Sequence, residues 1–83
     1  MPTVAVVDGA KIQFFAAEYP PPHFHVASGG YRAQISIDPL RLLNGYLPPA
    51  KLSAVLSWAS TRQAALMAAW DAIGEHRLPG RIE

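Results

Sequence analysis

The segment that decides the fold is residues 23–38, which read His-Phe-His-Val-Ala-Ser-Gly-Gly-Tyr-Arg-Ala-Gln-Ile-Ser-Ile-Asp. Apolar and polar residues alternate on both sides of Gly29-Gly30. Alternation with a period of two is typical of a β-strand that buries one face. The segment therefore predicts a β-hairpin that turns at the two glycines.

The length of this turn follows from the pairing of the apolar residues. A two-residue turn pairs Val26 with Ala33, and it pairs Phe24 with Ile35 on the same face. A three-residue turn would place Val26 against Arg32 and mix the two faces. The pattern therefore selects the Gly-Gly turn.

A second hairpin is predicted at the N-terminus, over about residues 3–16. The β-branched run Thr3–Val7 is followed by Asp8-Gly9, a strong signal for a two-residue turn, and then by a second strand. Pro20–Pro22 then forms a stiff connection to the hairpin at 23–38. Residues 40–47 contain Asn44-Gly45 and read as either a further tight hairpin or a loop.

The C-terminal half is predicted to be helical over about residues 49–74. The prolines at 48–49 suit a first helical turn, and Gly74 suits a helix end. Ser60 and Gln63 match a capping box, so we expect the helix to be kinked or broken near Ser60. Trp58 lies off the main apolar stripe, and we expect it to supply a second packing face, the alternative being an exposed anchor for a partner. The chain is thus predicted to be a single α+β domain over residues 1–83, with the helix packed on one face of a small antiparallel sheet.

Composition narrows the classes of function. Of 83 residues, 51% are hydrophobic and 16% charged, and a domain this small must leave some apolar residues exposed. We therefore expect a protein partner or a homodimer. The net charge of +1 argues against nucleic acid as the partner. The absence of cysteine, of a signal-like N-terminus and of a long apolar run leads us to expect a cytoplasmic protein that does not enter the membrane.

The string Pro-Pro-His-Phe-His-Val at residues 21–26 resembles a bacterial family, domain-of-unknown-function family 4160. The resemblance extends to Gly30-Tyr31, to the Gly-Tyr-Leu-Pro string at 45–48, and to the tryptophans of the helix. It implies a small bacterial protein from a compact two-gene cassette of the toxin–antitoxin or mobile-element kind. Family members often carry an acidic residue and a further histidine before the two prolines. Here the acid is kept as Glu18, but Tyr19 stands in place of the histidine. Arg32 stands where the family often has an acid.

His23 and His25 are two residues apart on a predicted strand, so both imidazoles leave the same face, about 7 Å apart at the backbone. Two neutral imidazoles at this spacing are able to hold a divalent metal if a third ligand is present. Glu18 is the nearest candidate in sequence, while His76 or Asp38 would have to be brought in by the fold. No cofactor is otherwise expected. The plainer interpretation, which the pattern favours over metal binding and catalysis, is that both histidines form ordinary hydrogen bonds across the sheet.

A catalytic alternative is a small metal-independent ribonuclease. His23 and His25 would act as general base and general acid, and Arg32 would stabilise the negatively charged transition state. Lys11 lies on the same predicted face. Against this, the near-neutral chain lacks the basic surface that holds RNA.

The predicted histidine face is partly apolar, because Val4, Val6 and Phe15 fall on the same side as Lys11 and Gln13. A mixed face of this kind indicates a surface that another protein covers. The leading hypothesis is therefore an interaction module of a two-gene cassette rather than an enzyme. The ribonuclease and the metal-binding domain are the alternatives.

Overall fold

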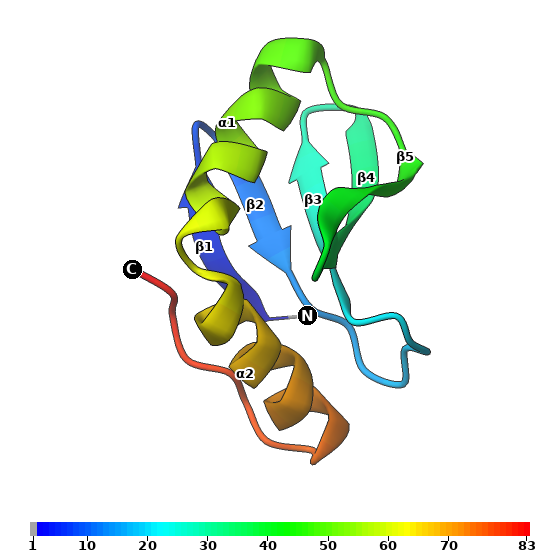
Figure 1. Ribbon diagram of the computed structural model, residues 1–83, viewed down its shortest axis with the longest axis vertical. Helices are drawn as coiled ribbons and strands as arrows, with labels where there is room; N and C mark the ends of the chain where they lie inside the picture. Colours follow the sequence, from blue (N-terminus) through cyan, green and yellow to red (C-terminus); the bar gives the residue numbers. More distant parts are fainter. Residues whose placement is uncertain (1) are drawn as a thin grey trace.

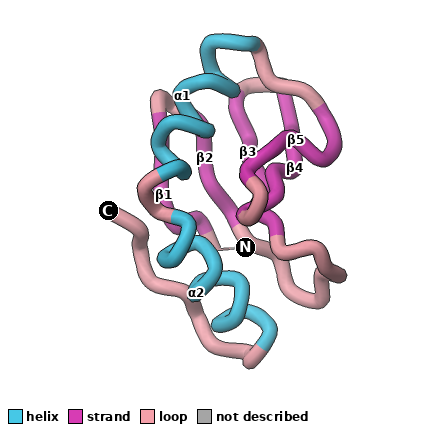
Figure 2. The backbone as a smooth tube through the Cα atoms, viewed as in Figure 1, coloured by secondary structure: helices cyan, strands magenta, loops and turns pink. Residues whose placement is uncertain are grey.

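A computed structural model describes residues 2–83, and its chain forms a five-stranded antiparallel sheet followed by two helices (Figure 1). The strands follow one another in the order β1-β2-β3-β4-β5. The elements are β1 (Thr3–Val7), β2 (Ala10–Gln13), β3 (His23–Ser28), β4 (Tyr31–Ile37), β5 (Leu40–Gly45), α1 (Pro49–Ser60) and α2 (Gln63–Gly74). The helices lie together against one side of the sheet (Figure 2). The α+β class is confirmed. The two predicted hairpins account for four strands, and β5 is the additional one.

The core lies between the sheet and the helices. Ile12, Phe24 and Ile35 are completely buried on the sheet side, and Val55 and Leu66 are completely buried on the helix side. Burying side chains of this size is the main favourable contribution to folding. Among the described residues, no helix is both long enough and apolar enough to cross a bilayer.

The pairing of β3 with β4 matches the register derived from the apolar pattern. Phe24 lies opposite Ile35, and Val26 lies opposite Ala33. The two-residue turn at Gly29-Gly30 is therefore confirmed. The histidines consequently alternate with the core residues and point to the opposite face.

The strand β1 contains an irregularity that the sequence reading did not anticipate. Its register with β2 shifts between Thr3 and Ala5, and both Val4 and Ala5 are buried. An extra residue in one strand shifts the alternation, so that consecutive residues can face the core. This explains why Val4 shares the apparent parity of polar residues, while Val6 remains 55% exposed.

Residues 40–45 form β5, which makes a hairpin with β4 around the turn at residues 38–39. Asn44-Gly45 is therefore not a hairpin turn. Gly45 lies at the end of β5, pairs with Ala33 and has φ +83°. A Cβ atom there would lie 2.2 Å from the carbonyl oxygen of Arg32, so glycine is required by the close approach of β4 as well as by its φ.

The predicted break in the helical region is confirmed. The prediction that Ser60 and Gln63 form a capping box is wrong. The break is at residues 61–62, one to two residues after Ser60. The hydroxyl of Ser60 donates instead to the carbonyl of Ser57. The side-chain amide of Gln63 donates to the backbone carbonyl of Ile37 over 2.8 Å. This bond fixes the start of α2 to the end of β4.

The end of the chain returns toward the first strand. After α2 ends at Gly74, as predicted, the residue with positive φ is His76. The backbone N–H of Ile82 donates to the carbonyl of Val4 over 2.8 Å, so the C-terminal segment covers part of the free edge of β1. Trp58 packs against the core, as expected, and the guanidinium of Arg62 lies 5.2 Å from the centre of its ring.

Candidate metal centre

The two imidazoles of β3 lie side by side on the sheet face opposite the core. The ring centres of His23 and His25 are 5.3 Å apart, as expected for residues two apart on a strand. On the neighbouring strands, His25 is flanked by Gln13 and Gln34. His23 is 6% exposed, whereas His25 is partly exposed.

Glu18 reaches the same point from the connection between β2 and β3. Its Oε1 atom contacts Nε2 of His25 and lies 3.4 Å from Nε2 of His23. One potential ligand atom from each of the three residues lies within 4.8 Å of the others. Donor atoms around a tetrahedral zinc ion with bonds of about 2.0–2.1 Å are separated by roughly 3.3 Å. The cluster therefore approaches the size of a metal site, and it brings together the three residues predicted from the sequence.

The tautomer of His23 follows from its hydrogen bond. Its Nδ1 atom lies 2.8 Å from the carbonyl oxygen of Pro21, which only accepts hydrogen bonds, so Nδ1 carries a proton and donates it. In a neutral ring, Nε2 then presents a lone pair. Nε2 is buried and has no hydrogen-bond partner among the described residues. An imidazole fixed through its other nitrogen in this way is the usual arrangement of a metal-ligating histidine.

The lone pair of His23 Nε2 faces an oxygen of Glu18 that also carries lone pairs. Burial acts to raise the pKa of Glu18, but its contacts with His25 and His23 outweigh burial and hold this pKa below its ordinary value. Glu18 is therefore ionised at neutral pH. Two facing lone-pair donors need a cation between them, which is either a proton on His23 or a metal ion.

Aromatic side chains hold both imidazole rings in place. Phe15 stacks on His25, with ring centres 4.0 Å apart, and Trp70 of α2 lies 5.2 Å from His23. Sequence reasoning did not assign Phe15, Trp70 or Pro21 to the site. Pro21 belongs to the same string as the histidines, but the roles of Phe15 and Trp70 depend on tertiary contacts that no sequence pattern reveals.

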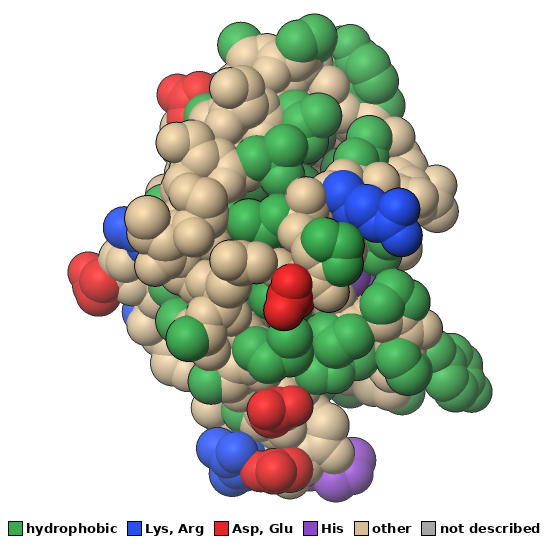
Figure 3. Space-filling view, in the orientation of Figure 1, with side chains coloured by type: hydrophobic (Ala, Val, Ile, Leu, Met, Phe, Trp, Pro, Cys, Tyr) green, Lys and Arg blue, Asp and Glu red, His purple; other side chains and the backbone are tan. Residues whose placement is uncertain are grey.

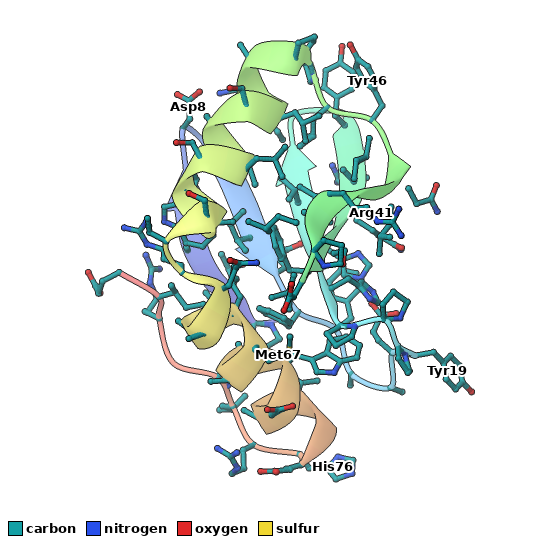
Figure 4. The ribbon with its side chains drawn as sticks, in the orientation of Figure 1. Asp8, Tyr19, Arg41, Tyr46, Met67 and His76 are labelled. Carbon is teal, nitrogen blue, oxygen red and sulfur yellow. The ribbon has the colours of Figure 1, made fainter. Side chains whose placement is uncertain are left out.

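The remaining candidates are not members of the cluster. Arg32 shares a small cavity of about 140 Å³ with His25, but its guanidinium donates to the carbonyls of Gly29 and Tyr31. His76 lies beyond the end of α2, where Figure 4 shows its ring at the periphery, and it lines a cavity with Glu18 without joining the cluster. Among the described residues, the group with metal-site spacing includes neither His76 nor Asp38.

The fold and the site together define a small α+β domain that carries a Glu/His/His cluster on the sheet face away from its helices. A family model described as a domain of unknown function, DUF4160, matches residues 9–71. The chain belongs to this family, which confirms the resemblance seen in the sequence. Searches of curated proteins and of solved structures each found no significant match. Inference about function therefore depends on the geometry of the site.

Proposed function

We propose that this chain is a metal-binding domain, which holds one divalent transition-metal ion between Glu18, His23 and His25. The observation that carries this proposal is the Nε2 atom of His23, which is buried without a hydrogen-bond partner among residues 2–83 while its Nδ1 donates to Pro21. A buried polar atom left without a partner costs about 1–3 kcal/mol. A metal ion at this point would satisfy Nε2 and both neighbouring ligands.

The donor set indicates the kind of metal. Two imidazole nitrogens and one carboxylate oxygen suit zinc or ferrous iron rather than calcium or magnesium, which prefer oxygen ligands. Three protein ligands leave at least one coordination position open for water or another molecule. A metal ion held in this way supplies Lewis acidity and lowers the pKa of bound water.

The ribonuclease hypothesis has less support from the same geometry. Nε2 of His23 is buried, so a ribose hydroxyl cannot reach it without a rearrangement. The guanidinium of Arg32 is bonded to backbone carbonyls at the hairpin turn.

The metal content of untagged protein tests the proposal directly. We expect about one equivalent of zinc or iron per chain, and submicromolar zinc affinity when the metal-free protein is titrated calorimetrically. Glu18→Gln and His25→Ala should each weaken binding at least tenfold, since each removes one of three ligands. His76→Asn is the matched control, because it removes the remaining histidine and asparagine tolerates its positive φ.

Circular dichroism would show that each variant is folded before its affinity is compared. A stoichiometry near zero in the wild type would refute the proposal. So would a His25→Ala variant that binds zinc as tightly as the wild type does.

A role in protein interaction is a second candidate, and exposed aromatic residues favour it. Tyr31 and Tyr46 are 47% and 55% exposed, and their ring centres are 5.6 Å apart. Tyrosines of this kind are frequent in protein interfaces. Sedimentation equilibrium tests self-association, and a monomer at all concentrations would exclude the homodimer. Membership of a two-gene cassette stays a prediction drawn from the family resemblance.

A further inference from the structure

A cavity adjoins the metal cluster. It has a volume of about 410 Å³ and lies between the β2–β3 connection and the C-terminal half of α2. Phe15, Pro20, Trp70 and Ile73 supply most of its apolar wall. The space-filling view shows hydrophobic side chains continuing from α2 toward this connection (Figure 3). Its volume falls within the range of cavities that bind small molecules.

Glu18 belongs both to the wall of this cavity and to the metal cluster. The two aromatic walls have the same double role, because Phe15 stacks on His25 and Trp70 lies against His23. Glu18 is therefore the point at which the cavity meets the cluster. A ligand that fills the cavity would bring its polar end to Glu18, next to the cluster.

The charge of the cavity depends on whether metal is bound. Among the described residues that line it, none is lysine or arginine, Glu18 is the one acidic group, and His76 is the one histidine. Without metal, the end of the cavity next to the cluster therefore carries the negative charge of the Glu18 carboxylate. A divalent ion beside Glu18 reverses this sign, because the two positive charges of the ion exceed the single negative charge of the carboxylate.

We propose that the metal-loaded cavity binds a small carboxylic acid with an aromatic or branched aliphatic body. This inference rests on the proposed metal-binding function and deepens it. The apolar walls accommodate the body of the acid, and its carboxylate occupies an open coordination position of the metal. Metal-free protein rejects the same acid, because Glu18 then faces it with a like charge.

A matched pair of probes tests this ligand class. Phenylacetate and phenethylamine have similar aromatic bodies and opposite charges, and both would be titrated into metal-free and zinc-loaded full-length protein. We expect phenylacetate to bind the zinc-loaded protein at least tenfold more tightly than the metal-free protein. Phenethylamine should show the opposite preference. In cobalt-substituted protein, phenylacetate should also change the visible absorption of the metal, which reports direct coordination.

A cavity-filling variant distinguishes this cavity from binding elsewhere on the surface. Ala16 is exposed and lines the cavity, so Ala16→Phe should abolish phenylacetate binding and leave zinc stoichiometry unchanged. Ala50→Phe is the matched control, since Ala50 is exposed at the start of α1 and lies outside this cavity.

The outcomes separate the two proposals. If zinc binds with a stoichiometry of one but phenylacetate affinity is the same with and without zinc, the ligand proposal fails and the metal site stands. Unchanged cobalt absorption, or full phenylacetate binding by Ala16→Phe, would also overturn the ligand proposal. If zinc does not bind, both proposals fail.

Discussion

At the scale of single residues, His23 combines deep burial with incomplete hydrogen bonding. The residue is 6% exposed, and one of its ring nitrogens has no hydrogen-bond partner among the described residues. Proteins rarely bury a polar atom in this way, because its desolvation is not offset. Sites selected for binding are a common exception, since the ligand completes the contacts.

His23→Met is expected to remove metal binding without destabilising the metal-free protein. Methionine fills a similar volume; loss of the Nδ1 bond to the Pro21 carbonyl costs about 1 kcal/mol, and removal of the unpaired Nε2 offsets this cost. We expect the free energy of unfolding of the metal-free variant to be within about 1 kcal/mol of wild type, measured by urea denaturation with a chelator present. Phe24→Ala, which empties a fully buried position next to it, should cost about 3–5 kcal/mol. A loss above about 2 kcal/mol for His23→Met would indicate a protonated His23 paired with Glu18 instead.

Glu18→Gln is expected to change how stability depends on pH in metal-free protein. The pKa of Glu18 is held below its ordinary value of 4.5, so the ionised carboxylate stabilises the folded state above that pH. This contribution is lost as the pH falls through the folded-state pKa. The stability difference between wild type and Glu18→Gln should therefore be larger at pH 5 than at pH 3.

The measurement is urea denaturation at both pH values in the presence of a chelator. Glu75→Gln is the control, because Glu75 is exposed and pairs with Arg77. A difference for Glu18→Gln that is constant from pH 3 to pH 5 would contradict the assignment of Glu18 to this interaction.

At the scale of elements, the sequence predicted the register of β3 and β4 because apolar pairing and turn length act together there. A one-residue slip would move Phe24 and Val26 to the polar face, so few alternatives survive. Because the two histidines alternate with these core residues, their shared face was predictable too. Glu18 lies close to His23 in sequence, which made the third ligand accessible to the same reasoning.

Other elements depended on contacts that local patterns do not encode. The irregularity in β1 lets Val4 and Ala5 both face the core, which a strict alternation assigns to opposite faces. Asn44-Gly45 has the composition of a hairpin turn. Its actual position at the end of β5 is set by the close approach of Arg32 in β4. Phe15 lies after the end of β2, and its place against His25 depends on the path of the following connection.

Gly45→Ala is expected to destabilise the pairing of β4 with β5. The φ of +83° alone disfavours alanine by about 1–3 kcal/mol. The new Cβ would also lie 2.2 Å from a backbone oxygen and 2.9 Å from the Cα of Ala33, so the strands would have to separate. Chemical denaturation measures the loss. Gly30→Ala is the control, because nothing lies within 4 Å of its Cβ position, and a similar loss there would contradict this account.

At the scale of the whole molecule, the helices cover one face of the sheet and the histidines lie on the other. The metal cluster nevertheless connects with the helical layer, because the ring of Trp70 in α2 lies against His23. A fixed position of the His23 ring should therefore stabilise the contact of α2 with the sheet. A metal bound at one point on the sheet would then stabilise the complete fold.

Zinc is accordingly expected to raise the melting temperature of the whole domain. A ligand that binds only the folded state, at a free concentration 100 times its Kd, adds about 2.7 kcal/mol to the free energy of unfolding. For a domain of this size, that corresponds to an increase of roughly 10–20 °C. Differential scanning calorimetry should show a single transition that moves with zinc concentration in wild type and His76→Asn. The transition of His25→Ala should move far less. An unshifted wild-type transition at saturating zinc would mean that the ion does not bind selectively to the folded chain, because selective binding must displace the unfolding equilibrium.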